Sequence, residues 1–158
     1  MRNIPLFVLF IFFASGSVFA AENTPWGTGN VKEINYKPNK VVYDVHVKTV
    51  ARLQSVLNRV SYLSKVYTAD PFSASIVVVL HGGEIPFFAV KNYNKYKDLM
   101  IRAESLTHDE VIKFRMCRIA ASAYGLKPKD IHGFVEIIPM ADAEIVRLQR
   151  DKGYAYMR

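Results

Sequence analysis

The amino-acid sequence predicts an α/β fold, with a mostly parallel sheet of about five strands between two layers of helices. Two observations predict it. Segments with strand character alternate with segments with helix character, which is the order found in βαβ units. The segment Ser75–His81, SIVVVLH, is almost continuously apolar, as is typical of strands that are covered on both faces. The length of 158 residues fits a single domain of this class.

The first half of the predicted domain contains two strands and one helix. Lys40–Val47, KVVYDVHV, is rich in β-branched residues and is predicted to be a strand. Thr49–Tyr67 is predicted to be an amphipathic helix that Thr49 caps, because apolar residues recur there at spacings of three and four. Ser75–His81 is the second predicted strand. The loop GGEIPFF follows it and is expected to open a short helix at Pro86.

The second half continues the alternation. In Asp109–Cys117 apolar and charged residues alternate, which predicts a third strand. Helices are expected on either side of it and again near the end of the chain, where Gly125 and Gly153 are typical helix stops. The remaining predicted elements are the helices Tyr96–Leu106, Arg118–Gly125 and Ala141–Gly153, a turn over Leu126–Ile131, and the strands Phe134–Pro139 and Tyr154–Arg158.

The first twenty residues, MRNIPLFVLFIFFASGSVFA, have the pattern of a secretory signal peptide. A basic residue, Arg2, precedes an apolar stretch, and small residues lead to Ala20. The apolar stretch is short for a membrane-spanning helix, so we expect cleavage after Ala20 rather than an uncleaved anchor. The mature protein is then periplasmic or secreted, without stable membrane insertion. Ala21–Asn39, rich in Gly, Pro, Asn and Thr, is predicted to be a loose extension before a domain over 40–158.

The chain is basic, with 21 Lys and Arg against 14 Asp and Glu and a formal charge of +7. Removal of the segment that contains Arg2 leaves 20 basic against 14 acidic residues, or +6. For an exported protein we do not expect nucleic acid as a partner. The charge favours anionic small molecules, anionic lipid or an acidic protein, unless it is simply a solvated surface.

Cys117 is the only cysteine, which excludes an intramolecular disulfide and a dithiol mechanism within one subunit. It lies where a predicted strand meets a predicted helix. Backbone N–H groups and the helix dipole at such a junction favour a thiolate, and Arg118 would add positive charge. The alternative is a buried and inert cysteine, because free cysteine is among the most buried residue types.

His81, Gly82 and Gly83 follow the second strand and form the other candidate site. The carboxyl ends of parallel strands share one edge of the sheet, where the functional crevice of such folds lies. His81 would donate a hydrogen bond to an anion or transfer a proton, and the two glycines would expose backbone N–H groups in a tight turn. The alternative is a histidine with a structural role in the loop.

Metal and cofactor sites are not expected. The four histidines, His46, His81, His108 and His132, show no spacing typical of metal ligands, and one cysteine cannot form a thiolate site. Acidic residues such as Glu84 form no pair suited to acid–base catalysis and are expected to be solvated charges. We predict neither a metal nor a cofactor.

Three segments resemble the DsrE/DsrF-like family of sulfur-relay proteins, and most of all its exported, single-domain branch. They are IVVVLHGGEIPFF, VIKFRMCRIAASAYGLKPKDI and IIPMADAEIVRLQRDKGYAYMR, and the resemblance covers about Lys40 to Arg158. It implies a three-layer α/β/α, flavodoxin-like architecture and a homo-oligomer. It also implies that Cys117 is persulfidated, receiving sulfane sulfur from one protein and passing it to another.

We therefore expect an exported sulfur carrier or sulfurtransferase in which Cys117 accepts sulfur and His81, Gly82, Gly83 and Arg118 support it. Sulfur donors and acceptors, whether proteins or small sulfur compounds, would be its partners. One alternative is a non-catalytic, oligomeric α/β module that binds a small anionic ligand or a partner protein, with a structural Cys117. A second is a redox sensor that forms an intermolecular disulfide through Cys117.

Overall fold

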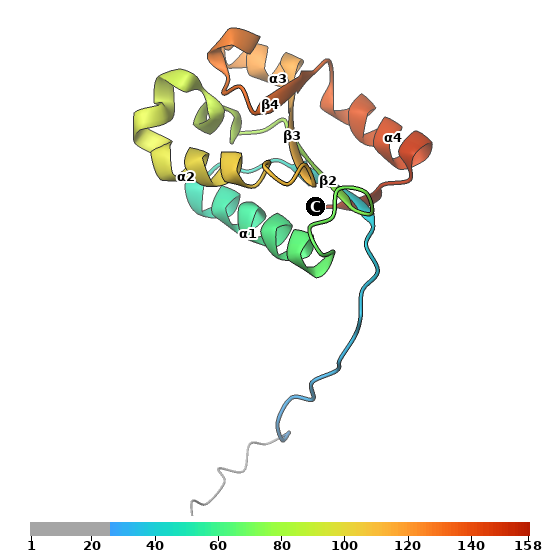
Figure 1. Cartoon of the computed structure of the whole chain (residues 1–158). Coiled ribbons are helices and arrows are strands. Elements are labelled where there is room, and N and C mark those ends of the chain that lie inside the picture. Colours follow the sequence, from blue (N-terminus) through green and yellow to red (C-terminus); the bar gives the residue numbers. More distant parts are fainter. Residues whose placement is uncertain (1–25) are drawn as a thin grey trace, which may run out of the picture. The chain divides into compact units, whose positions relative to one another are not determined.

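The computed structural model describes residues 26–158, and the predicted signal peptide lies outside the described part of the chain. Residues 26–39 are exposed and contain no helix or strand. From Lys40 onward the chain forms an α/β fold, as predicted (Figure 1). Within the described residues, none of the helices has the length and apolar character needed to cross a membrane.

Five strands form one sheet in which every pair is parallel. Their order is β4-β3-β2-β1-β5, so β2 is central. Flavodoxins have the order 2-1-3-4-5, so the likeness to them lies in the layered architecture and not in the strand order. The strands are β1 Lys40–Val45, β2 Ser75–Leu80, β3 Ile112–Cys117, β4 Val135–Ile138 and β5 Ala155–Met157.

The strand order explains how the helices divide between the two faces. Successive steps from β1 to β4 run in one direction across the sheet, and the step from β4 to β5 runs back. Because such crossovers are right-handed, α1 and α2 cover one face and α4 covers the other (Figure 1). The helices are α1 Val50–Val66, α2 Tyr93–Ser105, α3 Arg118–Ala123 and α4 Ala141–Lys152, with 3-10 turns at Ile85–Phe88, Val90–Asn92 and Pro128–Asp130.

Most element boundaries agree with the predicted ones, and the exceptions have local causes. The Thr49 hydroxyl caps α1 by accepting a hydrogen bond from the backbone N–H of Arg52, and Gly153, with φ of 70°, ends α4. Two predicted starts were wrong. α2 begins three residues earlier, at Tyr93, and its backbone departs from helical geometry at Tyr96. β3 begins at Ile112 because Glu110, with φ of 58°, has a left-handed conformation that differs from regular strand geometry.

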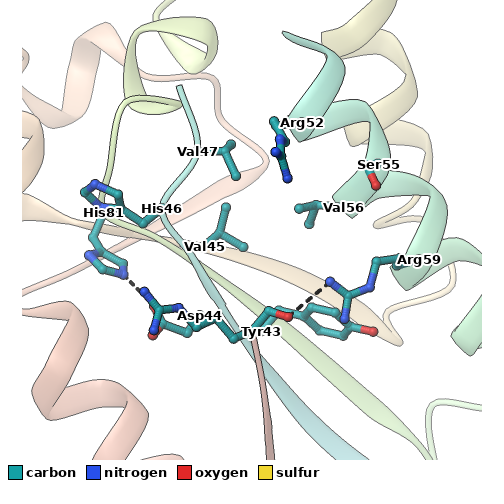
Figure 2. A pocket seen from close by; sticks show the side chains of 11 residues that line it. Tyr43, Asp44, Val45, His46, Val47, Arg52, Ser55, Val56, Arg59 and His81 are labelled. Carbon is teal, nitrogen blue, oxygen red and sulfur yellow. Dashed lines mark hydrogen bonds and ion pairs between the residues drawn. The ribbon is translucent and has the colours of Figure 1, made fainter. Parts of the chain in front are cut away.

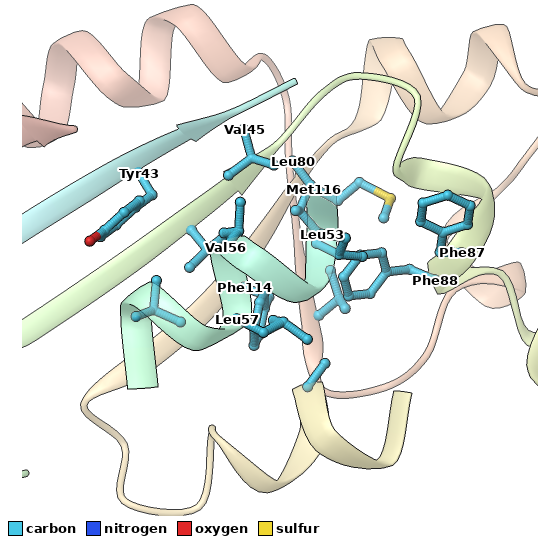
Figure 3. Packing of buried hydrophobic residues seen from close by; sticks show 14 of the residues in the cluster. Tyr43, Val45, Leu53, Val56, Leu57, Leu80, Phe87, Phe88, Phe114 and Met116 are labelled. Carbon is cyan, nitrogen blue, oxygen red and sulfur yellow. The ribbon is translucent and has the colours of Figure 1, made fainter. Parts of the chain in front are cut away.

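The larger part of the core lies between the sheet and the helices α1 and α2 (Figure 3). Alternate residues of the strands β1 to β4 point into it, and α1 contributes Leu53, Leu57 and Val60, which are fully buried. Phe88 and Phe114, with ring centroids 5.9 Å apart, fill the centre of this layer. The sheet is therefore held firmly on this face, and its carboxyl edge is a rigid platform for side chains.

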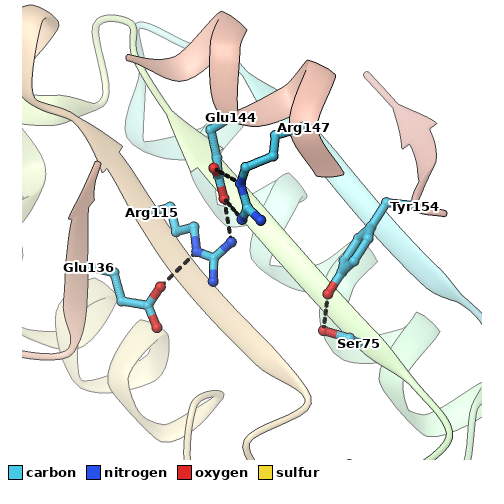
Figure 4. A network of polar contacts seen from close by, with 6 residues as sticks. All are labelled: Ser75, Arg115, Glu136, Glu144, Arg147 and Tyr154. Atoms are coloured by element: carbon cyan, nitrogen blue, oxygen red, sulfur yellow. Dashed lines mark hydrogen bonds and ion pairs between the residues drawn. The ribbon is translucent and has the colours of Figure 1, made fainter. Parts of the chain in front are cut away.

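The other face of the sheet carries α4 over a smaller apolar cluster that contains Val77, Val79 and Cys117. A network of ion pairs connects α4 to the strands β3 and β4 (Figure 4). The Arg115 guanidinium contacts Glu136 at 2.7 Å and Glu144 at 2.5 Å, and Arg147 donates to Glu144 at 2.8 Å. The hydrogen bond from Arg147 lowers the pKa of Glu144, burial opposes this, and the charges of both arginines add to the lowering. Arg115 is thus occupied by structural ion pairs.

Candidate functional site

Cys117 is the last residue of β3 and immediately precedes α3, as the sequence predicts. Its neighbour across the sheet is Ile138, the last residue of β4. After β3 the chain turns toward the α1 and α2 side, where Ala121 of α3 is buried in the larger cluster, whereas after β4 it enters α4 on the opposite face. Adjacent strands whose following helices diverge in this way form a topological switch point, where ligands of such sheets bind.

The Cys117 side chain is only 5% exposed, yet it lines a hollow of about 220 Å³ at this switch point. We call it the cysteine hollow. Small residues of α3 and α4, Ala120, Ala123 and Ala141, leave the space open. The other lining residues are His81, Ile119, Met140 and Asp142. Cys117 therefore belongs both to the apolar cluster under α4 and to the lining of a hollow that reaches the surface.

The structure brings His81 to the same hollow as Cys117. Leu80 pairs with Met116, so the residues that follow them, His81 and Cys117, are neighbours at the carboxyl edge. His81 Nε2 lies 2.5 Å from Asp44 Oδ1, and the Tyr156 hydroxyl donates to Asp44 Oδ2 at 2.5 Å. A carboxylate only accepts hydrogen bonds, so Nε2 carries a proton and the lone pair of the neutral ring is on Nδ1.

Asp44 is a site residue that the sequence reasoning missed. It lies inside β1, and its partners are 37 and 112 residues away along the chain. Burial raises the pKa of the Asp44 carboxyl, but the hydrogen bonds from Tyr156 and His81, with the charges of His81 and Arg158, outweigh it and hold the pKa below its usual range. Asp44 is therefore ionised at neutral pH and fixes the orientation of the His81 ring.

The lowered pKa of Asp44 predicts a pH dependence of stability. A carboxyl with a lower pKa in the folded state contributes stability above its unfolded pKa, and this contribution disappears as the pH falls through the folded value. We expect the Asp44→Asn variant to lose less stability than the wild type when urea unfolding is compared at pH 6 and at about pH 3. If both proteins lose the same amount of stability between pH 6 and about pH 3, the Asp44 carboxylate is not stabilised by its partners.

Two predicted contributions to the site, those of the Gly82 N–H and Arg118, and the predicted solvation of Glu84 do not fit the structure. The backbone N–H of Gly82 is not exposed, because it donates to Glu84 Oε1 at 2.7 Å. Glu84 is not a solvated charge: it is fully buried, and its other oxygen, Oε2, accepts from the N–H of Val47 at 2.8 Å. The Arg118 side chain lines neither hollow described here and has no hydrogen bond or ion pair among residues 26–158.

Gly82 and Gly83 instead allow two segments of backbone to meet. A Cβ atom on Gly82 would lie 2.6 Å from His46 Nδ1 and 2.8 Å from His46 Cα, and one on Gly83 would lie 2.9 Å from the carbonyl oxygen of Val47. These contacts are too short for any other residue type without backbone movement. The glycines therefore let the loop after β2 pack directly against the segment after β1, and the hydrogen bonds of Glu84 connect the two segments.

Replacement of Gly82 by alanine is expected to destabilise the protein by about 2 kcal/mol, because the new methyl group collides with His46 backbone. Chemical denaturation measures the change. The matched control is Gly133→Ala, where the structure leaves open space around the new Cβ, and this variant should remain close to the wild type. Equal stability of both variants would contradict the close packing of the two segments.

A second and larger hollow lies on the other side of His81, between β1 and α1, with a volume of about 510 Å³ (Figure 2). We call it the basic hollow. Arg52, Ser55 and Arg59 project into it from α1, and His46 and His81 come from the ends of β1 and β2. A signal for the α1 residues is present in the sequence, because spacings of three and four place them on one stripe of the helix.

Comparison with known proteins supports the fold and leaves the function open. No protein-family model matches the chain, and no curated protein matches it. Among solved structures, the chain is similar to MTH1491 from Methanobacterium thermoautotrophicum, described as a protein of unknown function. The two share 21% sequence identity with a TM-score of 0.62, over 76% of this chain and 98% of that one. The resemblance to the DsrE/DsrF-like family therefore stays a prediction.

Proposed function

We propose that the protein carries sulfane sulfur as a persulfide on Cys117 and passes it to an acceptor. The observation that carries the proposal is the position of Cys117 in one hollow with His81, whose ring Asp44 orients. A thiol next to a base whose orientation is fixed by a third group is the arrangement that activates nucleophiles. With the resemblance to sulfur-relay proteins, it favours a reactive thiol over an inert one.

The proposed chemistry has two steps. His81 Nδ1 takes the proton of the Cys117 thiol, directly or through one water molecule, and leaves a thiolate. The thiolate then attacks the outer sulfur atom of a donor persulfide, R–S–SH. A new S–S bond forms on Cys117, the S–S bond of the donor breaks, and R–S⁻ leaves with the electron pair of that bond. The product is Cys117–S–SH, and no external oxidant or reductant is needed.

The surroundings of Cys117 suit this role. The alanines of α3 and α4 leave room for an added sulfur atom in the cysteine hollow. Apolar side chains at its rim, Ile119 at 62% and Met140 at 43% exposure, offer a surface to a donor or acceptor protein. We include in the proposal a periplasmic or secreted location after removal of residues 1–20, and a homo-oligomer.

Mass spectrometry of the intact protein tests the proposal. The mature protein, reduced and freed of small thiols, is incubated with a small-molecule persulfide or polysulfide, and its mass is followed with time. The wild type should gain one sulfur atom, which cyanide or a reducing thiol removes, and the Cys117→Ser variant should gain none. The proposal fails if the wild type stays unmodified, or if Cys117→Ser is modified to the same extent.

A further inference from the structure

We propose that the basic hollow is a binding site for a small divalent oxyanion of the sulfate type. The proposal goes beyond the persulfide chemistry, since it does not depend on Cys117. The sequence suggests a small anionic ligand as one alternative but does not indicate where it would bind. The basic hollow supplies one, at the carboxyl end of β1, where crevices of parallel sheets receive their ligands.

The basic hollow has more positive than negative side chains in its lining, three arginines against one aspartate. Among residues 26–158, no Asp or Glu side chain forms an ion pair with Arg52, Arg59 or Arg158. Arg59 lies over the Tyr43 ring, 5.2 Å from its centroid, and donates to the main-chain oxygen of Arg158. The only Asp or Glu in the lining is Asp44, which is hydrogen-bonded to His81 and Tyr156. Guanidinium groups without acidic partners favour an anion between them.

The position of Arg52 is unfavourable for the helix itself. It lies in the first turn of α1, which contains no acidic residue. The positive end of the helix dipole disfavours a cation there, so the helix alone gains nothing from this arginine. A sequence that breaks such a local rule often does so at a functional site. An anion in the basic hollow would interact favourably with both Arg52 and the dipole.

The wall of the basic hollow is fixed before any ligand arrives. The fully buried Glu84 carboxylate accepts hydrogen bonds from the N–H groups of Val47 and Gly82. These hydrogen bonds connect the segments that follow β1 and β2. Gly82 touches His46 so closely that no side chain fits between them. His46 and His81, with ring centroids 5.5 Å apart, are therefore held in place across from α1. Such preorganisation lowers the entropic cost of binding.

The chemical class of the ligand follows from the donors and their number. Two guanidinium groups of α1 that pair with no Asp or Glu side chain among residues 26–158 match two negative charges, and arginine donates in pairs to the oxygens of sulfate-like groups. The Ser55 hydroxyl adds a neutral donor between them on the same stripe of α1. His81 lines both hollows, so an anion bound here lies beside the histidine proposed to deprotonate Cys117.

Nuclear magnetic resonance titration of the mature protein with sodium sulfate tests the site, with ionic strength held constant by sodium chloride. We expect saturable shifts of the backbone N–H signals of Val47, Arg52 and Ser55. Arg52→Gln should weaken sulfate binding at least about tenfold, the loss expected for one charge-assisted hydrogen bond. Arg150→Gln removes one charge from an exposed position on α4, which lies on the other face of the sheet, and should bind as the wild type does.

Two results would overturn the proposal: shifts that chloride alone produces to the same extent, and equal sulfate affinity of Arg52→Gln and the wild type. The Cys117→Ser variant separates this proposal from the persulfide chemistry. It should bind sulfate with unchanged affinity, and a loss of binding in this variant would contradict a site formed by α1 and β1. Arg52 is exposed, so its substitution is expected to leave the fold intact, and the unchanged spectrum of the remaining residues checks this.

Discussion

The Glu84→Ala variant is expected to be less stable than the wild type by about 3 kcal/mol. Its carboxylate is fully buried and accepts hydrogen bonds from the N–H groups of Val47 and Gly82. Hydrogen bonds to charged groups contribute about 1.5–3 kcal/mol each, and a buried N–H without a partner is costly. Removal of the carboxylate leaves two such groups and a cavity. Urea unfolding at neutral pH measures the loss.

The control for Glu84→Ala is Glu33→Ala, which removes an exposed carboxylate from the extension and should change stability by less than about 0.5 kcal/mol. Glu84→Gln is expected to lie between the two, because an amide oxygen still accepts one hydrogen bond while its NH₂ group faces the other N–H. If Glu84→Ala is as stable as Glu33→Ala, the buried carboxylate does not join the ends of β1 and β2.

The His81→Gln variant is expected to take up sulfur at Cys117 about 100-fold more slowly than the wild type at pH 7, because it lacks the base that deprotonates the thiol. Glutamine still donates a hydrogen bond to Asp44, so the arrangement of the loop is retained. The rate is measured as the gain of one sulfur atom by mass spectrometry after addition of a small persulfide.

The pH dependence of this rate distinguishes a base from a structural residue. At alkaline pH hydroxide deprotonates the thiol without the imidazole, so the rate of His81→Gln should approach that of the wild type as the pH rises. A constant deficit at every pH would indicate that the substitution distorts the cysteine hollow. Equal rates at pH 7 would show that His81 takes no part in the reaction.

The fold is predictable from the sequence because its determinants are local. The apolar run of β2 and the three- and four-residue spacing of α1 are read within one segment, and both elements form close to their expected bounds. The start of α2 cannot be predicted in this way, because Tyr93, Asn94 and Lys95 show no apolar spacing and the backbone is irregular at Tyr96. Strand order cannot be predicted from periodicity either, because it depends on contacts between segments that are distant in the sequence.

Some residues of the candidate site can likewise be predicted from the sequence, and others cannot. Cys117 and His81 were identified because each follows a recognisable strand, and parallel strands place such residues at one edge. Asp44 is not identified from the sequence, and the prediction that Glu84 is a solvated charge was wrong, because their roles depend on partners that lie far away in the sequence, Tyr156 and Val47. The prediction that Gly82 exposes its N–H was wrong, since that N–H donates to Glu84 and the glycine permits close packing against His46.

The proposed function requires the Cys117 sulfur to react in the folded protein through the cysteine hollow. The most direct measurement is the rate at which a small alkylating reagent modifies Cys117 under native conditions, compared with the rate of global unfolding. We expect alkylation that is proportional to reagent concentration and faster than unfolding, and slower in His81→Gln at neutral pH. Alkylation that occurs only at the rate of unfolding, whatever the reagent concentration, would show that Cys117 is an inert core residue.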